Sequence, residues 1–295
     1  MNNFIADIGN AYVKAIFEGK KISFPSTVCV GVNGYKYNGE SFAVGLGGQY
    51  LIEYSKVDRD NDVELIIGAV DKFIGDKDML LVDKIVVGLP VSQWIKNKEK
   101  LEDKFRNLSP IVYYKDEQEK SIFFNDVEVQ PECIGVYYGV EDFNPQRPTI
   151  IIDVGGLTTD IVCISPDGTI TKPRTVNYGS LRLLNLIGKE IEMEYPDFGN
   201  LSITTVSDFV ENNKIRFKGE EYNMDFVYKS TLPTISELYS ILSLEYAEEL
   251  AYYEILMLDR VGLYYEAFSQ RLPHIIHTTN SFANAEGFKV LSELK

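Results

Sequence analysis

The chain has 295 residues, of which 45% are hydrophobic, and a formal net charge of −15, so it is long enough for two ordinary domains with a sizeable core. The acidic balance argues against broad binding to nucleic-acid phosphates and suits either a basic partner or a solvated acidic surface. The sequence shows no signal-peptide pattern, no apolar run of membrane-spanning length and only three widely spaced cysteines, so we expect a cytoplasmic protein without direct membrane contact, in which Cys29, Cys133 and Cys163 are reduced core residues.

The first half of the sequence is predicted to consist mainly of strands. Short apolar runs predict strands over residues 3–9, 11–19 and 22–26, and residues 31–55, rich in Gly, Tyr and Asn, predict a small irregular lobe. Apolar residues at helical spacing predict a helix over 63–74. The elements expected after it are a strand over 84–90, an amphipathic helix over 92–107, and strands over 110–114 and 120–130.

The segment "FNPQRP", near residue 145, indicates a boundary, because the opening pattern repeats after it. Residues 5–25, "IADIGNAYVKAIFEGKKISFP", and 151–173, "IIDVGGLTTDIVCISPDGTITKP", each read as a strand ending in Asp-x-Gly, a tight turn and two further strands. Such an internal duplication predicts two similar halves. The elements expected after the repeat are a helix over 179–195, a small inserted lobe over 196–234, a long helix over 235–253, a strand over 254–258 and a final helix over 280–294.

The two Asp-x-Gly turns carry polar residues that a core does not need. Glycine-rich turns bring backbone N–H groups close to a ligand, and anionic phosphate oxygens are the natural ligands of such groups. Threonine hydroxyls in the second turn add donors. The candidate phosphate-binding residues are Gly9 and Asn10 in the first turn, and Gly155, Gly156, Thr158 and Thr159 in the second.

Each turn also follows an aspartate, Asp7 or Asp153, which would repel a bare phosphate. The conflict disappears if a divalent cation lies between the carboxylates and the phosphates, and carboxylate oxygens suit Mg²⁺ held largely through its water shell. Lys14 places a positive charge near the first turn, where it suits a β- or γ-phosphate. Neither a Walker loop nor a GxGxxG dinucleotide fingerprint occurs in the sequence.

Three further segments complete a recognisable set: "KIVVGLPVSQW" (84–94), "QPECIGVYYG" (130–139) and "NSFANAEGF" (280–288). In order and spacing, these segments and the paired turns resemble the actin-like superfamily, in particular the ParM/AlfA-type segregation actins of plasmids and phages. The resemblance spans nearly the whole chain. It implies an α/β fold of the duplicated, ribonuclease H-like kind, with two domains and a nucleotide cleft between them.

The resemblance also implies where the chain divides. The first domain would cover residues 1–144, with a small upper lobe at about 31–60, and would be completed by the C-terminal helix at 281–295. The second domain would cover 145–280, with an inserted upper lobe at about 190–234.

Site roles follow from the resemblance, with ATP or GTP and Mg²⁺ as the implied cofactors. Asp7 and Asp153 would hold the Mg²⁺ shell, with Asp153 also catalytic. Glu132 would position the attacking water, although an exposed helix-capping role is an equal alternative for it. Asp160 would hydrogen-bond the second turn. The implied nucleotide contacts are Gly9, Asn10 and Lys14 on one side, Gly155, Gly156, Thr158 and Thr159 on the other, and Glu211 and Lys214 near the ribose.

The chain departs from the family pattern after the strand at 254–258. Where family members carry a glycine triplet close to the adenine and ribose, this chain has Leu258, Asp259, Arg260 and Val261, and only Gly262 remains. Side chains there would crowd a base seated in the usual way. Three interpretations stay open: the base sits differently, against Arg260; nucleotide affinity is weak or unselective for the base; or the alignment slips here.

The leading functional hypothesis is a nucleotide-dependent, filament-forming protein that segregates or positions plasmid or phage DNA. Self-association would be driven by ATP or GTP, hydrolysis would destabilise the filament, and a basic DNA-binding adaptor would connect the acidic filament to DNA. The main alternative is a non-polymerising ATPase or small-molecule kinase of the same superfamily. A third possibility is a scaffold that has kept the fold and lost turnover.

Overall fold

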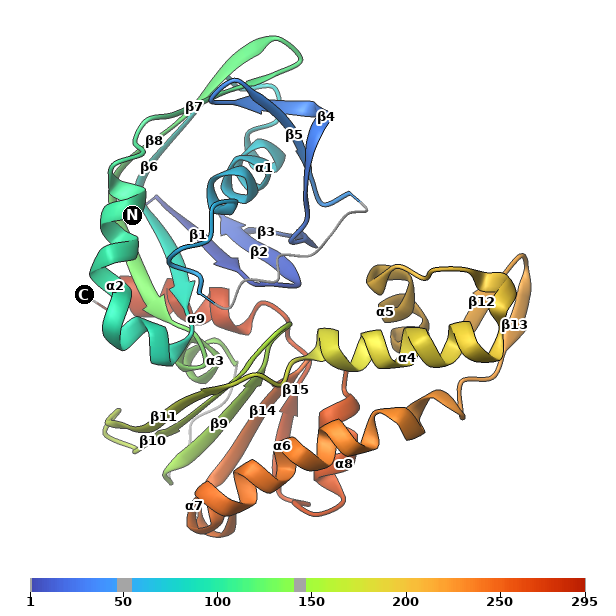
Figure 1. Cartoon of the computed structure of the whole chain (residues 1–295). Coiled ribbons are helices and arrows are strands. Elements are labelled where there is room, and N and C mark those ends of the chain that lie inside the picture. The colour runs from blue at the N-terminus through green and yellow to red at the C-terminus, as the bar shows by residue number, and fades with distance from the viewer. Residues whose placement is uncertain (1, 47–54, 141–146, 295) are drawn as a thin grey trace.

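The computed structural model describes residues 2–46, 55–140 and 147–294, and its body is built on two sheets (Figure 1). The first has the strand order β3-β2-β1-β6-β8-β7-β4-β5, and the second has the order β11-β10-β9-β14-β15. The strands of the first sheet are β1 (Asn3–Ile8), β2 (Tyr12–Phe17), β3 (Lys20–Pro25), β4 (Val28–Tyr37), β5 (Glu40–Val44), β6 (Met79–Leu89), β7 (Ile111–Lys115) and β8 (Gln118–Pro131). Those of the second are β9 (Thr149–Val154), β10 (Thr159–Ile164), β11 (Ile170–Val176), β14 (Glu254–Asp259) and β15 (Ile275–Thr278).

One arrangement of five strands occurs in both sheets, which confirms the predicted duplication. In each sheet three successive antiparallel strands, β1-β2-β3 or β9-β10-β11, are extended by two strands parallel to the first one, β6 and β8 or β14 and β15. The central strands β1 and β9 are almost wholly buried. A strand covered on both faces reads as a continuous apolar run, which is why both runs were visible in the sequence.

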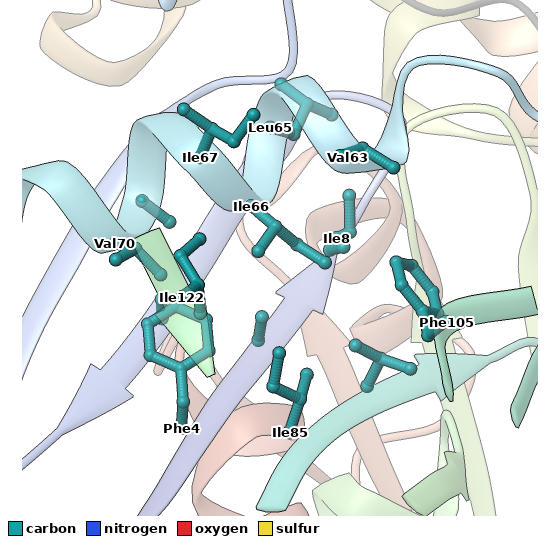
Figure 2. Packing of buried hydrophobic residues seen from close by; sticks show 14 of the residues in the cluster. Phe4, Ile8, Val63, Leu65, Ile66, Ile67, Val70, Ile85, Phe105 and Ile122 are labelled. Atoms are coloured by element: carbon teal, nitrogen blue, oxygen red, sulfur yellow. The ribbon is translucent and has the colours of Figure 1, made fainter. Parts of the chain in front are cut away.

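The helices of the first sheet are α1 (Asp62–Ile74) and α2 (Val91–Arg106), close to their predicted bounds. The sheet curls around α1, so that this helix contacts β1 and β2 on one side and β4 and β5 on the other (Figure 1). Figure 2 shows Ile66 and Val70 of α1 facing Phe4, Ile8 and Ile85 of the sheet, all within one buried apolar cluster. This packing fixes the strand β1, which leads directly into the first turn.

The second sheet is covered by α4 (Ser180–Glu194), α6 (Leu232–Glu245), α7 (Ala247–Tyr252) and α8 (Leu263–Ser269). Between α4 and α6 the chain forms a small lobe, which stands out to one side in Figure 1. The lobe contains the short helices η1 (Pro196–Phe198) and η2 (Val227–Ser230), the helix α5 (Ile203–Asn212) and the hairpin of β12 (Ile215–Phe217) and β13 (Glu220–Tyr222). An aromatic contact between Phe198 and Phe217, with ring centroids 4.1 Å apart, supports the hairpin.

Two predictions about local structure are wrong. The predicted irregular lobe over 31–55 contains, in its described part, most of β4 and all of β5; these strands extend the first sheet, and Tyr35 packs there on Phe42 and Tyr113. The long helix over 235–253 is broken at Tyr246, whose hydroxyl donates to the Lys172 carbonyl at 2.9 Å. The strand β15 and the helix α8 were not predicted at all.

The short helix α3 (Ile134–Gly139) crosses the C-terminal helix α9 (Ala283–Glu293) at very close range. A Cβ atom at Gly139 would lie 1.8 Å from the Ala283 carbonyl oxygen, and one at Gly287 would lie 1.8 Å from the Gly135 carbonyl oxygen. Only glycine therefore fits at this crossing. The crossing brings the "QPECIGVYYG" and "NSFANAEGF" segments together below the first turn.

Other predictions concern the whole chain. Among the described helices, none is long and apolar enough to cross a membrane. Cys133 and Cys163 are buried as expected, whereas Cys29 is only partly buried, so the prediction of a core position is wrong for Cys29. The domain division at residues 144 and 145 falls outside the described residues and stays a prediction.

Candidate functional site

The two predicted hairpins have the same register. In the first, Asp7 of β1 lies opposite Lys14 of β2, and in the second, Asp153 of β9 lies opposite Asp160 of β10. The aspartates at the strand ends are thus equivalent, but the residues facing them differ in charge. The duplicated turns therefore present one ion pair and one pair of carboxylates.

The backbone of the two turns is also equivalent. The N–H of Gly9 donates to the Tyr12 carbonyl at 3.0 Å, and the N–H of Gly155 donates to the Thr158 carbonyl at 2.9 Å. Each hydrogen bond closes a four-residue turn directly after the aspartate strand. The next residue along each turn, Asn10 or Gly156, lines the cleft.

The two turns meet across a single cleft. A Cβ atom on Gly156 would lie 2.9 Å from the Cβ of Ala11, so the backbones of the turns are in direct contact. The predicted site residues that line the cleft are Asp7, Gly9, Asn10, Lys14, Glu132, Asp153, Gly155, Gly156, Thr158, Asp160 and Arg260. Segments about 150 residues apart in the sequence are thus brought to one place.

The first side of the cleft holds a buried ion pair. The ammonium of Lys14 lies 3.0 Å from the carboxylate of Asp7, and both side chains are largely buried. Burial by itself lowers the pKa of Lys14, but the charge and hydrogen bond of Asp7, together with the charges of Asp153 and Glu132, outweigh it, so the pKa is raised. Lys14 therefore remains a fixed positive charge at the first turn.

The second side is organised by Asn284 of α9. Its amide nitrogen donates to the Asp153 carboxylate at 2.7 Å, and its amide oxygen accepts from the Cys133 N–H at 3.1 Å. Burial raises the pKa of Asp153 to about 6, although the Asn284 hydrogen bond opposes the shift. Asn284 thus fixes one proposed Mg²⁺ carboxylate to the α3–α9 crossing, a role that the sequence signalled only through the "NSFANAEGF" motif.

Asp160 is hydrogen-bonded by protein groups rather than left open to the cleft. The Thr175 hydroxyl donates to its carboxylate at 2.6 Å, and the same hydroxyl lies 2.6 Å from that of Ser92 on α2. Burial raises the pKa of Asp160 well above its ordinary value. This bond joins Asp160 to β11 rather than to the second turn, so the hydrogen bond expected between Asp160 and that turn stays a prediction.

Glu132 lies at the end of β8, inside the cleft. It is only 8% exposed, and its carboxylate contacts the ammonium of Lys56, which is also buried. Burial raises the pKa of Glu132, and the charge of Lys56 opposes the shift. The alternative of an exposed helix-capping residue is therefore wrong, since Glu132 is buried among charged groups.

The comparisons with known proteins agree with this geometry. Residues 6–135 match the family model described as the N-terminal domain of actin-like proteins. An archaeal actin homolog, solved as a complex with ADP, superposes with a TM-score of 0.82 at 16% identity, covering 100% of both chains. The chain has an actin-like fold.

Two further solved structures share this actin-like fold. The actin-like protein Alp7A has a TM-score of 0.81 at 15% identity, covering 99% of this chain and 96% of its own. A subunit of a 15-stranded ParM filament from Clostridium botulinum has a TM-score of 0.74 at 20% identity, covering 100% of both chains. No curated protein sequence matches the chain.

The segment where the resemblance predicts a glycine triplet lies beside the second turn. In the parallel pairing of β14 with β9, Leu258 is opposite Asp153. Leu258, Arg260 and Val261 line the cleft, so this part of the actin-like cleft is narrowed by side chains. The Arg260 guanidinium stacks 4.0 Å from the ring centroid of Tyr12, which belongs to the first turn.

Three predicted nucleotide contacts do not line the cleft. Thr159 is fully buried, and its hydroxyl donates to the Tyr178 carbonyl. Glu211 lies at the edge, where it accepts from Arg260 at 3.2 Å. Lys214 is exposed and pairs with Glu221 at 3.0 Å in the small lobe.

Sequence reasoning missed two basic residues just before α1. Lys56 lines the cleft and contacts Glu132, while the fully buried Arg59 donates to the Asn10 side chain at 3.2 Å and to the Ile8 carbonyl at 3.0 Å. No spacing or repeat marked these residues in the sequence. Their partners become visible only when the chain is folded.

The charges of the cleft fit a metal-bound polyphosphate better than a bare one. Its lining carries four carboxylates and three basic groups, so a phosphate without a counter-ion would be repelled. Among the residues that the structure describes, no group of three or more His, Cys, Asp or Glu side chains is placed to hold a metal. The carboxylate oxygens of Asp7 and Asp153 fit Mg²⁺ bound through water and phosphate oxygens.

Proposed function

We propose that this chain is a nucleotide-dependent, filament-forming actin-like protein that segregates or positions plasmid or phage DNA. The observation that carries the proposal is the pair of equivalent turns, with Asp7 and Asp153 at their bases, facing one cleft. The archaeal relative solved with ADP supports nucleotide binding, and the ParM and Alp12 filament structures support self-association.

The proposed ligand is ATP or GTP with Mg²⁺. The N–H groups of Gly9 and Gly155 close the turns, so the backbone amides of the next residues, Asn10 and Gly156, would bind the phosphates together with the Lys14 ammonium. Asp7 and Asp153 would hold the Mg²⁺ water shell, and the ion would neutralise phosphate charge when bound. Since Arg260 and Val261 narrow the region where relatives have glycines, the base would sit against Arg260.

The proposed reaction is hydrolysis of the terminal phosphate. Glu132 orients a water molecule whose oxygen forms a bond to the γ-phosphorus while the bond to the β–γ bridging oxygen breaks. The water proton passes to the Glu132 carboxylate and then to the released phosphate, which leaves a nucleoside diphosphate and inorganic phosphate. Burial raises the pKa of Glu132, which suits a group that accepts and returns a proton.

The proposed assembly is a filament that engages DNA indirectly. With a net charge of −15, its surface would repel DNA phosphates and attract a basic DNA-binding adaptor. Nucleotide binding would favour assembly, and hydrolysis within the filament would favour disassembly.

The decisive experiment is sedimentation of the purified chain with and without Mg²⁺-nucleotide, combined with phosphate release. We expect pelleting only with Mg²⁺-ATP or Mg²⁺-GTP, and phosphate release that rises with pelleted protein. Phosphate release without pelleting at any concentration would instead support the ATPase or kinase alternative. Absence of both would support a scaffold without turnover.

Two variants locate the chemistry. Asp153→Ala should abolish Mg²⁺-nucleotide-dependent pelleting. Glu132→Gln should keep nucleotide binding and pelleting but slow phosphate release by about 100-fold or more, giving longer-lived polymers. Glu248→Gln, on the exposed face of α7, is the matched control and should behave as wild type. Wild-type hydrolysis by Glu132→Gln would show that the catalytic assignment is wrong.

A further inference from the structure

The segment before α1 connects the two parts of the cleft where hydrolysis would occur. Arg59 ties this segment to the first turn through Asn10, and Lys56 contacts Glu132. Arg59 is 1% exposed and Lys56 is 4% exposed, so both residues are buried parts of the cleft rather than surface groups.

The three basic groups lining the cleft have different partners. Lys14 pairs with Asp7 directly across the hairpin, and Arg260 pairs with Glu211 and stacks on Tyr12 at the other end. Lys56 alone among these lining cations contacts the carboxylate proposed to orient water. If Glu132 orients the attacking water, a cation in contact with it would lie next to the terminal phosphate.

The backbone at Lys56 is anchored, whereas its side chain is free to change partner. The Lys56 N–H donates to the Gln93 side-chain oxygen at 3.0 Å, and Lys104 donates to the carbonyls of Val57 and Arg59. These bonds fix the segment to α2. The four-carbon stem of a lysine allows its ammonium to move without moving the backbone.

We propose that Lys56 senses the terminal phosphate: its ammonium exchanges the Glu132 carboxylate for the γ-phosphate of a bound nucleoside triphosphate, which leaves Glu132 to orient water. This inference rests on the proposed function. The exchange keeps the ammonium paired with an anion in both positions, so the lysine itself never becomes an uncompensated buried charge. A diphosphate lacks the group that draws Lys56 away, so Glu132 stays paired with it.

The test compares triphosphate with diphosphate binding. Lys56→Met keeps the apolar stem and removes the charge. The affinity for a non-hydrolysable Mg²⁺-triphosphate analogue should fall about tenfold, as expected for one lost charge-assisted hydrogen bond. The affinity for Mg²⁺-ADP or Mg²⁺-GDP should stay within about threefold of the wild-type value. Phosphate release should fall at least as much. Lys56→Arg should restore part of both. Lys100→Met, an exposed lysine paired with Asp58 of the same segment, is the matched control.

Two outcomes overturn the inference. Equal loss of triphosphate and diphosphate affinity would show that Lys56 only supports the fold of the cleft, and faster phosphate release by Lys56→Met would show that it only restrains Glu132. Should Lys56→Met fail to fold, the double variant Lys56→Met/Glu132→Gln removes both charges. Its ratio of triphosphate to diphosphate affinity then tests the inference in the same way. If wild type binds no Mg²⁺-nucleotide, the proposed function itself fails, which is a distinct result.

Discussion

At the residue scale, Asp259 shows how this chain uses a position where its relatives are expected to have glycine. The carboxylate is fully buried, and one of its oxygens accepts the N–H groups of Tyr264 and Tyr265 at 2.8 and 3.0 Å, at the start of α8. The other oxygen has no hydrogen-bond partner within the described residues. Asp259 therefore stabilises the start of α8 by hydrogen bonds, while Arg260 and Val261 line the cleft.

Replacing Asp259 by Asn should change how stability depends on pH. Burial raises the pKa of Asp259 in the folded chain above its unfolded value. The folded state then binds more protons than the unfolded state between these two pKa values, so wild-type stability falls as pH rises through that window. The carboxamide can accept the same two N–H bonds without this loss, so the Tm of Asp259→Asn minus that of wild type should grow from pH 4 to pH 7.5.

Asp167→Asn is the control for that measurement. Asp167 is exposed, and the N–H of Thr169 holds the pKa of its carboxylate below the ordinary value. Its contribution to stability is present above the unfolded pKa and is lost as pH falls, so the Tm difference for this variant should not grow with pH. A pH-independent Tm difference for Asp259→Asn would contradict the assignment of a raised pKa.

At the scale of elements, the crossing of α3 and α9 connects the C-terminal helix to the cleft. Close approach at Gly135, Gly139 and Gly287 leaves no room for side chains. Asn284, one turn before Gly287 on α9, is thereby placed to hold both Asp153 and the N–H of Cys133. Packing of two helices thus positions a carboxylate on a third element.

Gly287→Ala should lower the free energy of unfolding by about 1–3 kcal/mol, because the added methyl meets the backbone of Gly135, which cannot move without separating the helices. Urea unfolding measures the change. In the control Gly188→Ala on α4, the nearest atom is a flexible methyl of Val206 at 3.2 Å, and the gain in helix propensity offsets the contact, so the change should stay within about 1 kcal/mol. Equal stability of the two variants would refute the tight crossing.

At the scale of the whole molecule, side chains bridge the cleft between the two sheets. The guanidinium of Arg260, after β14, stacks on Tyr12 of the first turn, and Ser92 of α2 is hydrogen-bonded to Thr175 of β11. A cation stacked on an aromatic ring contributes about 0.5–2 kcal/mol. The closed arrangement of the cleft therefore depends on a few identifiable contacts.

Arg260→Ala should loosen the first turn in the protein without added nucleotide. We expect amide hydrogens of residues 9–12 to exchange about 3- to 10-fold faster, since the stack that holds Tyr12 against the second sheet is lost. Hydrogen exchange with mass spectrometry checks this. Arg271→Ala removes a similar stack, on Tyr239 within the second half, and should leave exchange at residues 9–12 unchanged. Equal effects of both variants would show that Arg260 does not bridge the cleft.

The sequence by itself determined the features that depend on neighbouring residues. The paired hairpins were predictable because each is a local unit of two strands and a turn, and the duplication made Asp7, Gly9, Asp153 and Gly155 stand out. The strands β1 and β9 are buried on both faces, and such strands appear in a sequence as largely apolar runs. The actin-like fold was predicted from a resemblance, which the order and spacing of these turns and three further segments carried.

Only the tertiary structure decided the features that depend on distant partners. Lys56 meets Glu132 from 76 positions away, and Arg59 meets Asn10 from 49, so no local pattern marks either contact. The helix expected over 235–253 is interrupted at Tyr246, whose hydroxyl is hydrogen-bonded to the carbonyl of Lys172, 74 positions earlier. Periodicity and turn residues record local preference, whereas the partner of a buried charge or hydroxyl is fixed by packing across the whole fold.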